Sequence, residues 1–162
     1  MSFVRNGLVA APALAIAALM AGSSSAADVT PFASLAGSWS GAGQIRLEGG
    51  KYENIRCRAF YTLPEKEKLG MAIRCASSSN KIEMRASLTY ANGKVTGDWE
   101  ERTFNAAGNV AGTTSGSHMT LNIEGGGLTG SLAVRLGEKS QLVSISTEGS
   151  AFRGLSLSLT RG

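Results

Sequence analysis

The sequence predicts an all-β fold, a small antiparallel up-and-down β-barrel of eight to ten strands with one disulfide inside a hairpin. After residue 27, apolar and polar residues alternate with period two, and no segment keeps a helical period for three turns. The only two cysteines, Cys57 and Cys75, lie symmetrically about Lys66. Asn92-Gly93 is a strong signal for a tight hairpin, because a type I′ turn needs positive φ at both central residues.

Residues 1–27 have the pattern of a secretory signal peptide. Arg5 is followed by an apolar run over 7–20 and a small-residue cleavage region over 21–27. A spanning helix needs about 20 apolar residues, so the mature chain is expected to have no transmembrane segment. An uncleaved N-terminal anchor is the alternative. Residues 28–162 then form a single barrel domain, exported to the periplasm or the extracellular space, where a disulfide persists.

The net charge of the chain does not favour nucleic acid as a partner. Removing Arg5 from the 16 Lys and Arg leaves 15, against 12 Asp and Glu. This small excess is scattered along the chain, so the sequence does not indicate a nucleic-acid-binding protein. We expect no cofactor, and nothing in the sequence predicts the oligomeric state.

The first predicted strand covers residues 37–47, and a turn at 48–51 leads into the cysteine hairpin. Opposed residues of an antiparallel pair lie about 4.5–5.5 Å apart between Cα atoms, which suits a disulfide. The bridge would enclose 17 residues and stabilise the fold by about 3 kcal/mol. The predicted partners, all on one face, are Cys57 with Cys75, Ala59 with Ile73, Tyr61 with Met71, and Leu63 with Leu69.

After a turn at 77–80, a second hairpin is centred on Asn92-Gly93. This turn predicts four pairs on the inner face: Tyr90 with Val95, Leu88 with Gly97, Ala86 with Trp99, and Met84 with Glu101. In the pair of Ala86 with Trp99, a small residue lies opposite a large one, as close packing of the interior requires.

The second half of the chain gives weaker signals. We expect a loop at 105–109, an extended segment at 110–124, and strands over 128–136, around 143–147 and around 155–160. The segment 110–124 is too long for an ordinary strand. A break within 112–116 would give ten strands, and no break would give nine. An open sheet of this length would leave two reactive edges, which favours closure into a barrel.

Gly37-Ser38-Trp39 resembles the Gly-x-Trp opening of calycin-type barrels, the lipocalins and their relatives. The resemblance implies that Trp39 lies at the closed end of the barrel, with a basic residue of the last strand, here Arg161, packed over it. That contact requires an even number of strands. The layout is also similar to that of small exported Gram-negative proteins of uncharacterised function. An ordinary core tryptophan at a strand start is the alternative for Trp39.

No catalytic site is predicted. His118 is the only histidine and its phase points outward, and no free cysteine or second histidine is present to build a metal site or a nucleophile–base pair. We therefore expect that the protein is not an enzyme and holds no metal.

The predicted ligand site is the barrel interior. Glu101 is the one charged residue that falls within a run of inner positions, and continuing the register past 105–109 places Thr113 opposite Glu101 and Ser115 opposite Trp99. These polar groups and Thr103 would lie beside an apolar lining of Trp99, Tyr61, Tyr90 and Met84, as in a typical ligand pocket. An unpaired, buried Glu101 would have a raised pKa. A one-residue bulge that turns Glu101 outward is the alternative.

The outer face of the same strands carries a ladder of charges. The register places Arg58 opposite Arg74, Arg74 opposite Glu83, Glu83 opposite Arg102, and Arg85 opposite Glu100. Such a face could bind anionic lipid head groups or a cell-wall polymer. The alternating signs favour a solvated sheet face instead.

Three functions are consistent with these observations. The first is binding of a small apolar or amphipathic ligand inside the barrel. The second is an envelope accessory or interaction protein without an internal ligand. The third is a proteinase inhibitor or a small hydrolase; the inhibitor would use the hairpin loop at 64–67.

Overall fold

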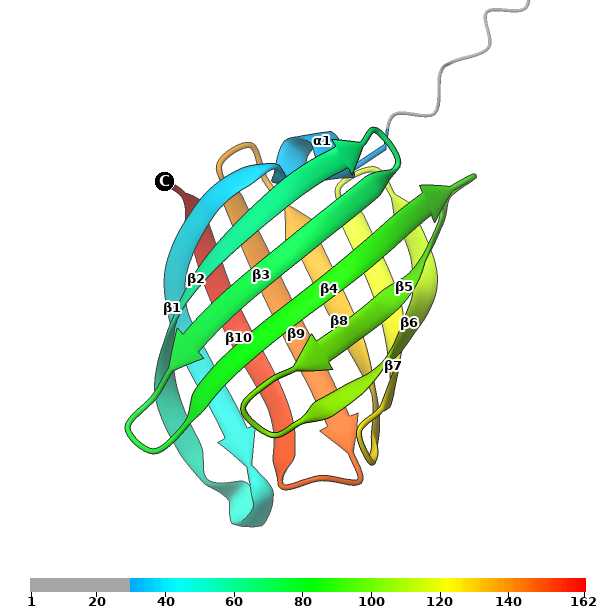
Figure 1. Ribbon diagram of the computed structural model, residues 1–162. Coiled ribbons are helices and arrows are strands. Elements are labelled where there is room, and N and C mark those ends of the chain that lie inside the picture. The colour runs from blue at the N-terminus through cyan, green and yellow to red at the C-terminus, as the bar shows by residue number, and fades with distance from the viewer. Residues whose placement is uncertain (1–29) are drawn as a thin grey trace, which may run out of the picture.

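The computed structural model describes residues 30–162, so the predicted signal peptide lies outside the described residues. Ten antiparallel strands form a closed barrel in which each strand pairs with its neighbours in the chain and β1 pairs with β10 (Figure 1). The elements are α1 (Phe32–Leu35), β1 (Gly37–Leu47), η1 (Glu48–Gly50), β2 (Tyr52–Glu65), β3 (Lys68–Ala76), β4 (Lys81–Ala91), β5 (Lys94–Glu101), β6 (Ala106–Ser115), β7 (His118–Gly125), β8 (Leu128–Leu136), β9 (Ser140–Glu148) and β10 (Phe152–Arg161). The all-β barrel that the sequence predicts is confirmed.

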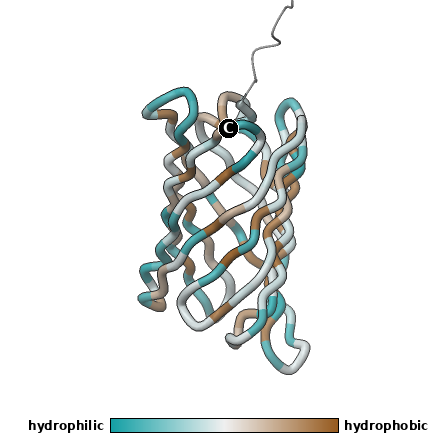
Figure 2. The backbone as a smooth tube through the Cα atoms, turned by 90° about the vertical axis from the view of Figure 1, so that its right-hand side faces the viewer, coloured by the Kyte–Doolittle hydropathy of each residue, from teal (hydrophilic) through white to brown (hydrophobic). Residues whose placement is uncertain are grey.

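The period-two alternation is kept through most of the barrel and is interrupted at two register shifts, between Arg46 and Leu47 and between Thr62 and Glu65. Along β4, for example, Lys81, Glu83 and Arg85 are exposed, whereas the residues between them are buried or half-buried. Figure 2 shows the same alternation as hydrophobic and hydrophilic positions that follow one another along the strands. Since side chains of a strand point alternately to its two faces, one set fills the interior and the other forms the outer surface.

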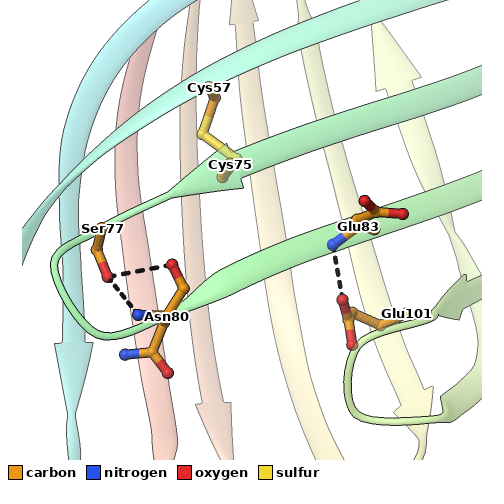
Figure 3. Close-up of a disulfide and its surroundings, with 6 residues drawn as sticks. All are labelled: Cys57, Cys75, Ser77, Asn80, Glu83 and Glu101. Carbon is orange, nitrogen blue, oxygen red and sulfur yellow. Dashed lines mark hydrogen bonds between the residues drawn. A yellow bond between two sulfur atoms is a disulfide. The ribbon is translucent and has the colours of Figure 1, made fainter.

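Both predicted hairpins have the expected register. Cys57 pairs with Cys75 at a Cα separation of 4.1 Å and the two form the disulfide (Figure 3). The four pairs around Asn92-Gly93 are also confirmed, and both turn residues have positive φ. One detail is wrong. The register shifts between Thr62 and Glu65, so Leu63 is not the partner of Leu69 and the turn consists of residues 66 and 67.

The predicted register between β5 and β6 is wrong. The turn lies at residues 102–105, earlier than the predicted loop at 105–109, and Asn105 has a φ of 52°. As a result Glu101 pairs with Ala106, and Trp99 pairs with Gly108. The chain enters β6 with its parity changed, so Thr113 pairs with Lys94 on the outer face. The predicted partner of Glu101, Thr113, lies seven residues beyond the observed one, and any odd shift in register exchanges the two faces of a strand.

The long segment 110–124 divides at Gly116 and Ser117, which gives β6 and β7 and brings the number of strands to ten. With an even number of strands, the start of β1 and the end of β10 lie at the same end of the barrel. Trp39 accordingly pairs with Arg161.

Several inner glycines allow adjacent strands to approach closely. A Cβ on Gly41 would lie 1.8 Å from the carbonyl oxygen of Ser158, and one on Gly108 would lie 1.8 Å from that of Glu124. These are backbone atoms of the neighbouring strand, which cannot move aside as a flexible side chain can. The small residues on the inner face therefore serve the close approach of strands at these positions.

Candidate functional site: the barrel interior

One end of the barrel is closed. Helix α1 lies across this end (Figure 1), where Phe32 is fully buried and Leu35 is 4 % exposed. The ring of Phe32 meets that of Tyr90 edge to face, with 6.3 Å between the centroids. Inner side chains of the surrounding strands are also buried here, among them Leu69, Val95 and Leu159. These buried side chains and α1 fill most of this end of the barrel.

Trp39 and Arg161 hold the closing segment in place. The guanidinium carbon of Arg161 lies 4.4 Å from the ring centroid of Trp39, which is the contact that the resemblance to calycin-type barrels implies. The Trp39 indole donates a hydrogen bond of 2.7 Å to the carbonyl oxygen of Leu35. Arg161 donates to the carbonyl oxygens of Ala36 and Ser34. Together these bonds tie α1 to the first and last strands.

The opposite end of the barrel is open. Inner apolar side chains in this half remain partly exposed although they point inward. They come from strands on both sides of the barrel: Ile73, Ile82, Met84, Ile123, Leu132, Ile145 and Leu155. Inward side chains of a closed barrel can be reached by solvent only through an open end. The interior is therefore lined mainly by apolar side chains, with α1 across one end and partly exposed side chains toward the other; we call this apolar lining the cup.

Glu101 lies at the rim of this cup. Its phase is inward and its strand pairing is regular, so the alternative of an outward bulge is wrong. Its carboxylate accepts a hydrogen bond of 2.7 Å from the backbone N–H of Glu83 (Figure 3). Its other oxygen accepts one of 2.7 Å from the backbone N–H of Phe104. The carboxylate is thus neither unpaired nor deep in the interior. It closes the turn after β5 and fastens it to β4.

Glu53 occupies a comparable position on β2 at the same end. Its carboxylate accepts hydrogen bonds from the hydroxyl groups of Ser77, Ser78 and Ser79 and from the Asn80 amide. Figure 3 shows the further bonds between Ser77 and Asn80 that close this turn. The hydrogen bond from Ser77, followed by that from Ser79, lowers the pKa of Glu53 to about 2, from an ordinary value of 4.5.

This shift predicts how the turn responds to acid. Because the pKa of Glu53 is lower in the folded protein, its contribution to stability is complete above about pH 4.5, decreases as the pH falls, and is lost near pH 2. An NMR titration of the Glu53 side-chain carboxyl should give a midpoint near 2. Glu53→Gln should remove this part of the acid dependence. A midpoint near 4.5 would contradict the arrangement of the turn.

The interior contains few polar groups. Between its two ends, the inner face of residues 30–162 carries no Lys, Arg, His, Asp or Glu. The hydroxyl of Tyr61 donates a hydrogen bond of 3.3 Å to Oε1 of Gln141, which is 1 % exposed. Burial raises the pKa of Tyr61 to about 12, so this residue is neutral. The described interior would therefore favour an uncharged guest.

Two buried donors in the interior lack a partner within residues 30–162. They are the indole Nε1 of Trp99 and the amide Nε2 of Gln141. Trp99 lies toward the open half, where the position of a Cβ on Gly126 is 3.3 Å from its ring. Tyr61 forms a hydrogen bond with Oε1 of Gln141 and not with its Nε2. An unmet buried donor costs about 1–3 kcal/mol, which a hydrogen-bond acceptor on a ligand would recover.

The structure brings together part of the predicted lining. Trp99, Tyr61, Tyr90 and Met84 point inward. Thr113 and Ser115 are exposed on the outer face, and Thr103 is exposed in the turn after β5, so the predicted polar patch is wrong. His118 is exposed, and its Nδ1 lies 3.2 Å from the hydroxyl oxygen of Ser117.

Gln141 is the interior residue that sequence reasoning missed. It precedes Val143 and Ile145 at the same phase on β9, and counting two residues back would have placed it inside. The sequence pattern predicts this strand only around 143–147, whereas it begins at Ser140, so Gln141 falls outside the predicted strand. Thr114, the inward neighbour of Thr113, was missed because of the register error in β6.

No group of three or more His, Cys, Asp or Glu within residues 30–162 is arranged to hold a metal ion. Helix α1 and the 3-10 turn η1 are far too short to cross a membrane, and these residues contain no other helix.

Comparisons with known proteins give similarity at the level of structure. No protein-family model matches the chain, and no curated protein matches it. The crystal structure of Rv2717c from M. tuberculosis has a TM-score of 0.68 at 15 % identity, covering 83 % of this chain and 99 % of that chain. The S-type phycobiliprotein lyase CPES from Guillardia theta has a TM-score of 0.55 at 11 % identity, covering 81 % and 90 %. At such identities the likeness shows the fold alone, a closed antiparallel β-barrel.

Proposed function

We propose that this protein binds a small, uncharged, apolar or amphipathic molecule inside the barrel. The observation that carries the proposal is the pair of unpartnered donors, Trp99 Nε1 and Gln141 Nε2, in an apolar cup that is open at one end. Ligand sites are usually mostly apolar cavities with a few polar groups that orient the guest. Here those groups are donors, so the guest would carry a carbonyl, ether or hydroxyl oxygen.

The proposal includes a compartment. A disulfide between two buried cysteines persists in an oxidising environment, which supports an exported protein of the periplasm or the extracellular space. A carrier of apolar molecules is useful there because such molecules are poorly soluble in water.

A binding titration with a neutral probe tests the proposal. N-phenyl-1-naphthylamine, an uncharged apolar fluorophore, should gain fluorescence in the protein and receive energy from Trp99 in a Trp39→Phe background. Ala106→Phe, at the inner face near the open end, should weaken binding at least about tenfold by filling the entrance. Ala107→Phe is the matched control, because this neighbour is exposed on the outer face, and it should leave binding unchanged. Equal binding by the two variants, or no binding by the unmodified protein, would contradict the proposal.

A second probe separates the role of the donor from that of the cavity. Prodan is a neutral fluorophore that carries a ketone oxygen. Trp99→Phe keeps an aromatic ring but removes the N–H, and it should weaken Prodan binding by about two- to tenfold while changing naphthylamine binding less. Equal effects on both probes would mean that Trp99 contributes only apolar surface. If neither probe binds, an interaction protein without an internal ligand becomes the better hypothesis.

A further inference from the structure

The outer wall of the barrel contains a hollow of about 1180 Å³ over strands β1 to β4. Its lining comes from these four strands together with Arg102 and Gly162, and includes no residue of β6 to β9, which form the wall across the barrel. The hollow therefore lies on the outer side of these strands. Inward residues such as Ile73, Ile82 and Met84 also belong to its lining, because the four strands form the wall between the hollow and the interior. Small outward side chains such as Ser40, Ala42 and Ala72 form its floor.

The charges around this outer groove have nearly all one sign. Its lining contains six cationic side chains and a single acidic one, Glu83. The cationic residues are Arg56, Arg58, Arg74, Lys81, Arg85 and Arg102. Among residues 30–162, the only ion pair that involves any of them joins Arg74 to Glu83 at 3.9 Å, with both side chains largely exposed. The predicted charge ladder has the expected register, but five of the cations form no ion pair with a carboxylate of residues 30–162.

The arrangement of these charges is itself unfavourable for the protein alone. Arg58 on β2 and Arg74 on β3 are direct cross-strand partners on the outer face. Like charges in such pairs destabilise a sheet, and an anion between them would relieve the repulsion. Guanidinium groups suit this role because their planar N–H donors match the oxygens of carboxylate, sulfate and phosphate groups.

We propose that the outer groove binds an acidic polysaccharide. A concave surface can hold a polymer chain, whereas a protein contacts a lipid bilayer with a flat or convex surface. The unpaired guanidinium groups would bind the acidic groups of the chain, and Phe60, 54 % exposed within the lining, offers an apolar face to a sugar ring. Single-stranded nucleic acid is bound through successive stacked aromatic residues, and Phe60 is the only exposed aromatic side chain in this lining.

The barrel offers a matched control surface. A second hollow of about 560 Å³ lies on the outer face of β1, β8, β9 and β10, and its only cation is Arg135. Replacing Arg135 and Lys139 on this side removes the same charge as replacing two arginines of the outer groove. The two double variants therefore distinguish a local site from attraction by net charge.

Fluorescence anisotropy with a labelled heparin oligosaccharide tests the proposal. Arg58→Gln/Arg85→Gln should weaken binding at least about fivefold and reduce the slope of log Kd against log salt by about two. Arg135→Gln/Lys139→Gln should change the affinity less than about twofold, and neutral dextran should not bind. The thermal midpoint of each variant establishes that it folds, and Arg56→Gln/Arg102→Gln provides a second test of the same groove.

Three results would overturn the proposal: no binding of heparin, equal weakening by the groove and control variants, or tighter binding to anionic vesicles or to single-stranded DNA. None of these results depends on the interior. Binding of the neutral probes inside the barrel should be the same in all the arginine variants.

Discussion

Trp39→Ala should lower the free energy of unfolding by about 3–5 kcal/mol, the largest effect expected of a single substitution in this chain. The side chain is 2 % exposed and is among the largest that are fully buried. Its loss would leave a cavity at the closed end, which the rigid wall of the barrel cannot collapse to fill. It would also deprive the Leu35 carbonyl of its hydrogen-bond donor and Arg161 of the ring beneath it.

Two further substitutions divide this effect into its parts. Trp39→Phe keeps most of the ring but removes the N–H, and should cost less than half as much as Trp39→Ala. Arg161→Gln removes the cation, worth about 0.5–2 kcal/mol over an aromatic ring, together with the bonds to Ala36 and Ser34. Urea denaturation followed by circular dichroism measures each value. Tyr52→Ala is the aromatic control, since that side chain is 62 % exposed and its loss should cost no more than about 0.5 kcal/mol. A cost below 1 kcal/mol for Trp39→Ala would show that α1 does not depend on this contact.

The closed end was only partly predictable from the sequence. The pairing of Trp39 with Arg161 required an even number of strands, which the sequence left open between eight and ten. Helix α1 has four residues, too few for any periodicity to reveal it. The closed end of the barrel could therefore be recognised only in the structure.

The accuracy of the strand registers depended on the turns. Asn92-Gly93 and the cysteine pair each determine a register locally, and the interior positions of Tyr61, Tyr90 and Trp99 follow from them. The segment 105–109 has no such marker. Its Ala, Gly and Asn residues suggest a loop, yet Gly108 is in a strand because it pairs with Trp99 and leaves no room for a Cβ. Tertiary packing therefore requires a glycine within the strand here, although glycine usually indicates a loop. Because the strand start was not recognised, the predicted register placed Thr113 and Ser115 on the wrong face.

The sequence pattern also did not predict the outer groove. The order of charges across the strands was predicted, and it favoured a solvated face with alternating signs. Register places Arg85 opposite Glu100, but the distance between their side chains decides whether they pair, and these two do not form an ion pair. A pattern of charges along strands therefore overstates how far they neutralise one another.

Reduction of the Cys57–Cys75 disulfide should lower the free energy of unfolding by about 3 kcal/mol. The bond joins residues 18 positions apart and restricts the unfolded chain, which is the main source of its stabilisation in the chain-entropy model. Denaturation of the unmodified protein with and without a reductant measures this effect directly. Because the reduced protein keeps both sulfur atoms, the comparison isolates the cross-link from the packing of the side chains.

Alanine variants complete the test. Cys57→Ala removes the cross-link and one sulfur atom, and Cys57→Ala/Cys75→Ala removes the cross-link and both. If the cross-link dominates, the single and double variants and the reduced protein should agree within about 1 kcal/mol. If the packing of the sulfur atoms dominates, the double variant should be the least stable and the reduced protein should resemble the oxidised one.

Burial makes a further, kinetic prediction about the same bond. Cys57 is 3 % and Cys75 is 7 % exposed, and both point into the barrel. A reductant should therefore reach the bond slowly in the native protein and rapidly in denaturant. The rate in native conditions should rise in Trp39→Ala, since opening of the barrel becomes more frequent as its stability falls. An unchanged rate in that variant would mean that the reductant enters through the open end of the cup, which would itself reveal a path wide enough for a small molecule.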